Sequence, residues 1–397
     1  MLISHRIALQ PSNRQKTYLG RACGVARFAF NWGLAEWKKQ YEAWKLDSSL
    51  EKPSQLSLRR KLNSIKREQF PWMLEVTKCA PQLALIQLGK AFENFFKGRA
   101  AFPRFHKKGI HDSFSISNDQ FSVVGKRIRI PSLGWVRMRE QLRFNGKIMS
   151  ATVSRTADRW YASITVDTPE ATLSRTENQG AVGVDLGISS LAVLSTGEKI
   201  EGARPLKALL SRQVRLSRSL SRKKKGSSNY RKARMELAKL HARIACIRSD
   251  GMHKLTTSLA RRFNVIGIED LNVRGMMSNH HLARSIADAG FFEFRRQLEY
   301  KGAMTGARII VADRWFASSR TCSACGALNE KLTLNIRQWT CESCGARHDR
   351  DVNAAMNLKN LAASSAVTAC GEESSGASRK GRTKLASMKQ EVSFNHI

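Results

Sequence analysis

Helical periodicity dominates the first hundred residues, after a short alternating segment. Apolar and polar residues alternate in HRIALQPS, which is typical of a strand. Apolar side chains then recur at helical spacing in two runs, and again from about residue 80 to residue 97. Residues 13–100 are therefore expected to form a helical domain. We interpret its aromatic side chains as bundle core rather than as platforms for nucleic-acid bases.

Short alternating segments, broken by Gly, Pro and Asn, fill residues 113–169. They include SFSIS, FSVVG, KRIRIP, GWVRM, ATVSRT and RWYASITVD. Such spacing predicts a small antiparallel barrel or sandwich, which the opening strand is expected to complete. The predicted barrel domain therefore comprises residues 1–12 and 101–172, with the helices inserted into it. ATLSRTENQG is interpreted as the linker that follows.

Buried strands and helices alternate in the second half of the chain. AVGVDLGI, LAVLSTG and KIEG predict three consecutive strands, and NVIGIEDL and ARIIVA predict two more. A helical hairpin is expected over residues 204–262, and one helix from about residue 282 to 304. This order is that of the RNase H-like fold, a mixed sheet flanked by helices. The predicted domain spans residues 178–314 and 347–362, and the Ser- and Gly-rich residues 363–397 are expected to be a disordered tail.

The net positive charge of the chain indicates a polyanionic partner. The chain has 68 Lys and Arg against 32 Asp and Glu, a formal net charge of +36. Such an excess opposes compaction unless a polyanion neutralises it. An anionic membrane surface is one alternative, but the basic residues are interleaved with aromatic ones over several segments, which favours a nucleic-acid groove. No apolar run is long enough for a membrane span and the N-terminus lacks a signal peptide's apolar core, so a soluble cytoplasmic protein is expected.

The predicted hairpin is the most basic segment. Residues 204–262 carry 18 Lys or Arg and two acids. A solvated charged face is the plain alternative, yet the ratio exceeds what solubility requires and favours contact with phosphates. The candidate nucleic-acid residues at its turn are Arg222, Lys223, Lys224 and Lys225.

Four cysteines have the spacing of a zinc ribbon, predicted over residues 315–346. Cys322 and Cys325 form one CxxC pair, Cys341 and Cys344 form another, and 15 residues separate the pairs. Each CxxC turn can direct two thiolates at one tetrahedral ion, and four sulfur ligands leave no position open. The ion would therefore be structural Zn²⁺. A redox role for one CxxC is the alternative that the paired spacing disfavours.

Three acidic positions suggest a second metal site. Asp185 lies within an apolar strand in GVDLG, and Glu269 ends another in IGIEDL. Burying an acid is costly without compensation, and two on neighbouring strands suggest a shared cation. Asp349 and Asp351 begin a later helix, where one could cap the N-terminus and the other face the ion. Convergent carboxylates suit Mg²⁺ or Mn²⁺, and two such ions can catalyse phosphodiester hydrolysis.

These motifs resemble one protein family. GVDLG, IEDL, the CxxC…CxxC ribbon and HDRDVNAA stand in the order seen in TnpB proteins, and RFAFNW, KAFENFFKGRAAFPRFHKKG and ACGEESSG are also similar to TnpB sequences. The resemblance is nearly full-length, and the ordered set is far more specific than the ribbon alone. TnpB proteins are prokaryotic, transposon-encoded RNA-guided nucleases related to type V CRISPR effectors.

The resemblance implies a fold, site residues and partners. It implies an α+β multidomain protein with a RuvC-type nuclease domain, an inserted zinc ribbon, a wedge barrel and a helical recognition domain. Its catalytic, metal-binding acids map to Asp185, Glu269 and Asp351, with Asp349 the weaker choice. It also implies a guide (omega-type) RNA, a double-stranded DNA target with a short adjacent motif, and a monomer in the ribonucleoprotein near the nucleoid. Lys78 and Gln82 match positions that read the motif, and their side chains suit base edges.

Two other functions remain compatible with these residues. An unguided transposase or junction resolvase of RNase H-like fold would use the same kind of metal site. A nucleic-acid-binding regulator without nuclease activity would use the ribbon and the basic surface alone. The long basic hairpin disfavours the first alternative, and the intact acids disfavour the second.

Overall fold

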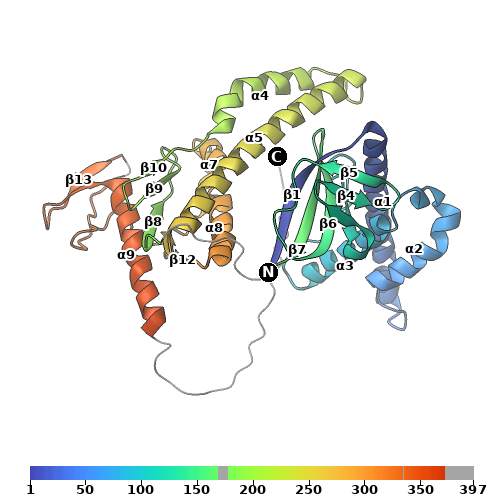
Figure 1. The fold of residues 1–397 in the computed structure, drawn as a ribbon, viewed down its shortest axis with the longest axis horizontal. Helices are drawn as coiled ribbons and strands as arrows, with labels where there is room; N and C mark the ends of the chain where they lie inside the picture. Colours follow the sequence, from blue (N-terminus) through green and yellow to red (C-terminus); the bar gives the residue numbers. More distant parts are fainter. Residues whose placement is uncertain (169–177, 334, 372–397) are drawn as a thin grey trace, which may run out of the picture. The chain divides into compact units, whose positions relative to one another are not determined.

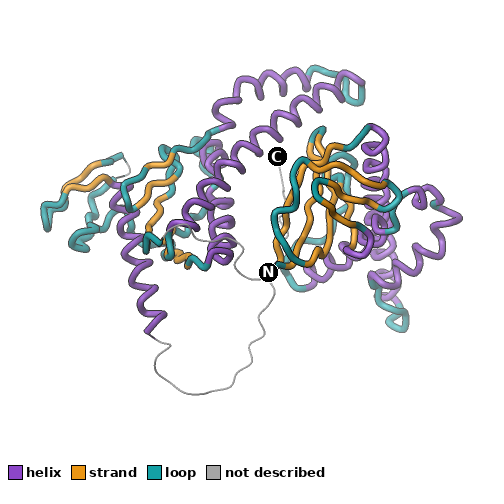
Figure 2. Tube along the Cα trace, viewed as in Figure 1, coloured by secondary structure: helices purple, strands orange, loops and turns teal. Residues whose placement is uncertain are grey.

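The computed structural model describes residues 1–168, 178–333 and 335–371 (Figures 1 and 2). Most of the linker predicted after the barrel therefore lies outside the described residues. The chain divides into two compact units, each described by itself. The first comprises residues 1–176, 202–261 and 273–306, and the second comprises residues 177–201, 262–272 and 307–397.

An antiparallel sheet of seven strands forms part of the first unit. Its order is β2-β6-β7-β1-β5-β4-β3, so the opening strand lies in the middle, between β7 and β5, and completes the sheet as predicted. One face is apolar and buried, because inward residues alternate with outward ones along β6 and β7. Closure of this sheet into a barrel stays a prediction. The strands are β1 Leu2–Gln10, β2 Ser113–Ser117, β3 Ser122–Val124, β4 Arg127–Ile130, β5 Gly134–Met138, β6 Lys147–Thr156 and β7 Arg159–Asp167.

The helices that follow β1 are α1 (Asn13–Leu46), α2 (Gln55–Gln69) and α3 (Cys79–Phe96), with a short 3-10 turn between the last two. A capping box begins α1, because the Ser12 side chain accepts a hydrogen bond from Gln15 N and the Gln15 side chain accepts one from Ser12 N. α1 packs against α3, and both contact β2. The aromatic residues are core as expected at Trp37 and Phe92, whose rings stack 4.1 Å apart, but Phe96 is 61% exposed.

The basic hairpin consists of α4 (Pro205–Ser221) and α5 (Ser228–Arg262), with its turn where the sequence predicts it. The single helix expected over residues 282–304 is instead two helices, α7 (Ala283–Ala289) and α8 (Phe291–Thr305). Gly290, with φ +72, adopts the left-handed conformation that ends α7. The prediction was wrong there because helical periodicity continues across this glycine. A short helix, α6 (Val273–Met277), was not predicted.

A five-stranded sheet forms the centre of the second unit. Its strands are β8 (Ala181–Asp185), β9 (Ala192–Leu194), β10 (Lys199–Ile200), β11 (Val265–Ile268) and β12 (Arg308–Val311). The order is β10-β9-β8-β11-β12, with the first three antiparallel and β8, β11 and β12 parallel. This is the predicted RNase H-like strand order, which brings two motifs 84 residues apart onto adjacent strands.

Helix α9 (Arg350–Gly371) packs closely on β8 and β11. Gly183 and Gly267 permit the approach: a Cβ at Gly183 would lie 1.8 Å from Ala355 O, and one at Gly267 would lie 2.3 Å from Leu358 O. The helix continues nine residues beyond the boundary expected at 362, and residues 372–397 of the predicted tail lie outside the described part. Among the described residues, no helix is both long and apolar enough to span a membrane.

Candidate active site

Asp185 and Glu269 leave the same edge of the second unit's sheet. Val184 on β8 pairs with Ile268 on the parallel strand β11. The next residue along each strand is the acid, so both carboxylates emerge at the carboxyl ends of adjacent parallel strands. Both residues are half-buried. The sequence places Asp185 within one apolar strand and Glu269 at the end of another, and the parallel pairing brings these two positions onto adjacent strands.

Asp349 and Asp351 have different roles in the structure. Asp349 Oδ1 accepts hydrogen bonds from the backbone N–H groups of Asp351 and Val352, at 3.1 and 3.2 Å, so it caps the start of α9. Its other carboxylate oxygen forms a 2.7 Å ion pair with Lys199. Asp351 is the acid of the two whose charge acts on Asp185. The geometry therefore favours Asp351 as the third member of the site.

The pKa of Asp185 responds to its burial and to the charges of the other two acids. Burial, and then the neighbouring charges of Glu269 and Asp351, raise the pKa of Asp185 from 3.8 to about 8, with partial opposition from Arg350 and Arg337. Like charges held together oppose ionisation unless a cation joins them. This set of oxygen donors fits a hard divalent ion, because Mg²⁺ and Mn²⁺ bind carboxylates and would supply the missing positive charge.

Basic side chains surround the acidic group. Arg337 Nη1 lies 3.1 Å from Asp351 Oδ1, and Arg314 Nη2 lies 2.7 Å from Asp270 Oδ2. These pairs are partly exposed, so each contributes little to stability. They place guanidinium groups around the site, where the phosphates of a bound strand could meet them.

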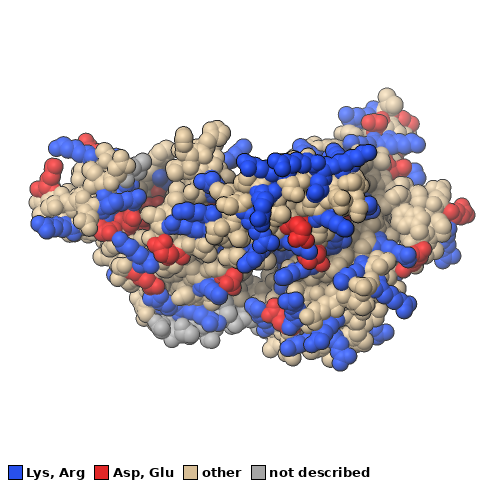
Figure 3. Space-filling view, turned by 90° about the horizontal axis from the view of Figure 1, so that it is seen from above, with Lys and Arg blue, Asp and Glu red and all other residues tan. Residues whose placement is uncertain are grey.

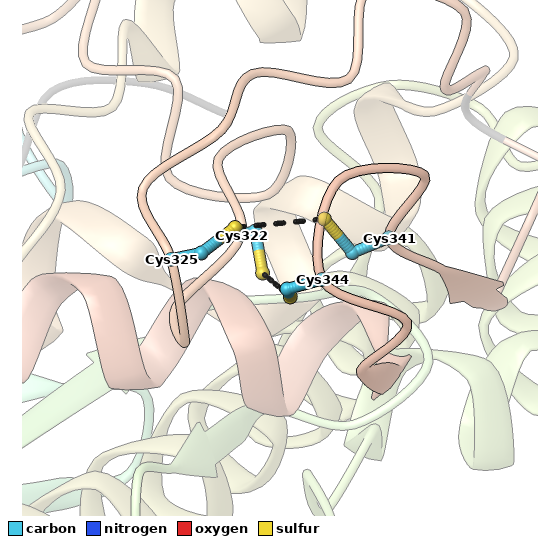
Figure 4. Close-up of side chains that lie close together, drawn as sticks. All are labelled: Cys322, Cys325, Cys341 and Cys344. Carbon is cyan, nitrogen blue, oxygen red and sulfur yellow. Dashed lines mark hydrogen bonds between the residues drawn. The ribbon is translucent and has the colours of Figure 1, made fainter.

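The four ribbon cysteines form a compact sulfur cluster (Figure 4). Cys322 Sγ lies 3.7 Å from Cys344 Sγ, and Cys325 Sγ lies 3.7 Å from Cys341 Sγ. Sulfurs bound to one tetrahedral Zn²⁺ at about 2.3 Å are separated by about 3.8 Å. The cluster therefore fits a structural Zn²⁺ with no position left for substrate.

Two further ribbon residues support the cluster. His348 Nε2 lies 3.0 Å from Cys322 Sγ, which places a ring nitrogen against a metal-binding sulfur, and burial lowers the pKa of His348. Trp339, on β13 (Gln338–Thr340), is 8% exposed and packs against the His348 ring, on β14 (Arg347–Asp349). Trp339 is thus a packing residue of the ribbon, whereas Arg347 is exposed.

The predicted nucleic-acid residues all lie in the first unit. Lys78 and Gln82 are exposed one helical turn apart, at the start of α3, so their side chains share a face. At the hairpin turn Arg222, Lys224 and Lys225 are exposed and Lys223 is half-buried. Figure 3 shows Lys and Arg side chains outnumbering acids over the α4–α5 hairpin.

The sequence did not reveal a second basic and aromatic surface, between α3 and β2. Phe96, Phe102 and Phe105 are 61%, 41% and 51% exposed. Five basic residues, and no acid, lie between residues 96 and 110. Asn31 on α1 anchors this segment, because its side chain exchanges two hydrogen bonds with the His106 backbone, at 2.7 and 2.9 Å. The alternation of Phe with Lys and Arg in FKGRAAFPRFHKK is the sequence feature that could have indicated this surface.

Sequence comparison relates the chain to known families. Residues 1–45 match a helix-turn-helix domain of OrfB proteins from IS605-type elements, and residues 163–280 match the OrfB family described as a probable transposase. Residues 291–358 match the TNB domain of Cas12f1-like proteins.

Relatives match over nearly the whole length. A Streptomyces pristinaespiralis protein, named as a candidate RNA-guided DNA endonuclease, is 38% identical, with 96% of this chain and 94% of that protein covered. An Escherichia coli K12 protein with the same kind of name is 33% identical, with 94% of each chain covered. A solved structure of Cas12f1 with guide RNA and target DNA superposes on this chain with a TM-score of 0.53, covering 87% of this chain and 83% of that one. The two sequences are 14% identical, so the likeness is one of fold.

Proposed function

Because this chain belongs to the TnpB family of IS605-type OrfB proteins, we propose that it is an RNA-guided DNA endonuclease whose catalytic acids are Asp185, Glu269 and Asp351. The observation that supports the assignment of the acids is that Asp185 and Glu269 stand at the carboxyl ends of adjacent parallel strands. Burial, and then the charges of Glu269 and Asp351, raise the pKa of Asp185 to about 8. Like charges near a buried carboxylate oppose its ionisation, and a site for hard cations would compensate for them.

The proposed chemistry is hydrolysis of a phosphodiester in a RuvC-type nuclease domain. When bound, two Mg²⁺ or Mn²⁺ ions supply an activated hydroxide and stabilise the leaving oxygen. Asp185, Glu269 and Asp351 would hold these ions, and Asp185 would do so as a carboxylate, giving up the proton that its raised pKa retains. Arg314 and Arg337, now paired with Asp270 and Asp351, are placed to contact the phosphates of the strand.

The proposed partners are a guide RNA and double-stranded DNA. The net charge of +36 suits two polyanions, and the α4–α5 hairpin and the segment between α3 and β2 offer basic surfaces for them. Base pairing with the guide would supply most of the sequence specificity. Lys78 and Gln82, exposed on one face of α3, would read the short adjacent motif through base edges. The wedge and recognition roles of the first unit, and a monomeric ribonucleoprotein, belong to the same proposal.

The test begins with the RNA that the protein carries. The full chain is purified from cells that also express the flanking transposon end, and any bound RNA is sequenced. A plasmid matching the RNA's 3′ segment, next to a randomised motif, is then offered with Mg²⁺. We expect cleavage that requires both the RNA and one motif. Sequence-specific cutting without RNA would contradict guidance and favour a resolvase, and joined rather than hydrolysed ends would indicate a transposase.

A further inference from the structure

Buried polar side chains connect the zinc ribbon to the carboxylate site. Ser318, Asn353 and Asn357 are 5%, 2% and 7% exposed. A buried polar group is costly unless its hydrogen bonds are made. In this case they are made, and together they link the loop before the ribbon, the first zinc knuckle and helix α9.

At the carboxylate end, the link terminates on Glu269. Ser318 Oγ donates a hydrogen bond to Glu269 Oε1 at 2.5 Å. The carbonyl oxygen of Ser318 accepts one from Asn357 Nδ2 at 2.7 Å. Helix α9 thus fixes the backbone of Ser318, and the Ser318 hydroxyl in turn orients the carboxylate.

At the ribbon end, two asparagines hold both sides of a zinc ligand. Asn353 Oδ1 accepts a hydrogen bond from Ser323 N at 2.9 Å, and Asn353 Nδ2 donates to Thr321 O at 2.7 Å. Asn357 Nδ2 donates to the same Thr321 oxygen at 2.6 Å. Thr321 and Ser323 flank Cys322. The asparagines are one turn apart on α9 and therefore share a face.

Helix α9 is common to both metal sites. It carries Asp351 and Asn353 in its first turn and Asn357 one turn further on, and it is held against β8 and β11 by close contacts at Gly183 and Gly267. A shift of the Thr321–Ser323 knuckle relative to this helix would alter the bonds to both asparagines. Through Ser318 it would also reach Glu269.

We propose that Ser318, Asn353 and Asn357 are positioning residues that couple the two metal sites. Zinc fixes the knuckle, the asparagines transmit that order to Ser318, and Ser318 holds Glu269 ready for a hard divalent ion. The inference rests on the proposed function, because it takes the carboxylates as a cation site. Coupling between sites is reciprocal, so a divalent ion at the carboxylates must also increase the affinity of the ribbon for zinc.

The first measurement is Mn²⁺ affinity, by calorimetric titration of the zinc-loaded full chain without nucleic acid. Removing partners that orient metal ligands typically weakens binding about 10- to 100-fold. We expect Ser318→Ala to weaken Mn²⁺ binding by about tenfold, and Ser318→Thr, which keeps the hydroxyl, to restore most of it. Ser364→Ala is the matched control, because that hydroxyl donates to Leu361 O at the far end of α9. Unchanged affinity in Ser318→Ala would overturn the positioning role.

The second measurement is the affinity for zinc, from equilibrium competition with a colorimetric chelator, with and without Mg²⁺. We expect Mg²⁺ to raise the zinc affinity of the native chain, but not of Ser318→Ala or Asn357→Ala. An equal increase in Ser318→Ala and the native chain would overturn the coupling. Asp185→Asn separates the two proposals: if it binds Mn²⁺ as tightly as the native chain, the carboxylate site itself is wrong.

Discussion

Without divalent cations, the raised pKa of Asp185 should destabilise the folded protein at neutral pH, and Asp185→Asn should remove that cost. The folded-state pKa is about 8, against 3.8 for the free group. Between these pH values the folded chain keeps a proton that the unfolded chain has lost. As far as this group is concerned, stability is therefore greatest below pH 3.8, falls as the pH rises, and levels off above pH 8.

The size of the effect follows from the same two values. Each pH unit within that window costs about 1.36 kcal/mol. At pH 7, about 3.2 units above the free-group pKa of 3.8, Asp185 opposes folding by on the order of 4 kcal/mol. Asparagine has nearly the same shape and cannot ionise. Its advantage should therefore be small at pH 4.5, a few kcal/mol at pH 7 and largest above pH 8.

The assay is amide hydrogen exchange in β8, β11 and α9, compared between variant and native chain at each pH, with zinc retained and no Mg²⁺ or Mn²⁺ added. Comparison at one pH cancels the intrinsic change of exchange rate. Glu342→Gln is the control, because that ribbon carboxylate is 79% exposed. An Asp185→Asn advantage that is absent, or that shrinks as the pH rises, would refute the reasoning. Added Mn²⁺ should then protect the native chain but not the variant.

Three further predictions concern packing and nucleic-acid contacts. Gly183→Ala should destabilise the second unit by more than about 3 kcal/mol in urea unfolding, because its Cβ would lie 1.8 Å from a carbonyl oxygen of α9. Gly251→Ala on α5 is the control: its added Cβ meets nothing within 4 Å, so this change should be neutral or stabilising. Replacing all four basic residues 222–225 by Gln should reduce the salt dependence of RNA binding by up to about three units of log–log slope, and an unchanged slope would remove the turn from the RNA interface. Lys78→Ala and Gln82→Ala should each weaken binding of the motif-bearing DNA by about 1–3 kcal/mol while RNA binding is unchanged; equal losses for RNA would make them general phosphate contacts.

The sequence predicted most of the fold because its signals are local. Alternation marked the strands of the first sheet, and apolar strands flanking long helices were sufficient for the five-stranded order. Gly290 was missed because hydrophobic spacing continues through it, and only its left-handed φ shows the break. The start of the predicted tail was placed too early, because residues 363–371 are helical although their composition is Ser-rich.

The sequence offers the residues of the candidate site, but not the hydrogen bonds that connect them. A carboxylate in an apolar strand is visible in the sequence, and so is a pair of CxxC turns. The choice between Asp349 and Asp351 required the structure, because two aspartates at the start of a helix are equivalent until one is seen to accept its N–H groups. Ser318 could not be predicted, because a lone serine gains its significance only from the carboxylate it contacts.

The most direct test of the carboxylate site compares Asp349 and Asp351, two residues apart, in the RNA-loaded protein. Cleavage of a matching DNA target and DNA binding are measured for Asp351→Asn and Asp349→Asn, beside Asp185→Asn and Glu269→Gln. Asn can still cap a helix, so Asp349→Asn should retain cleavage within about tenfold. The other three should lose it while binding RNA and DNA normally. Retained cleavage in Asp351→Asn with loss in Asp349→Asn, or loss of binding in all four, would contradict this account.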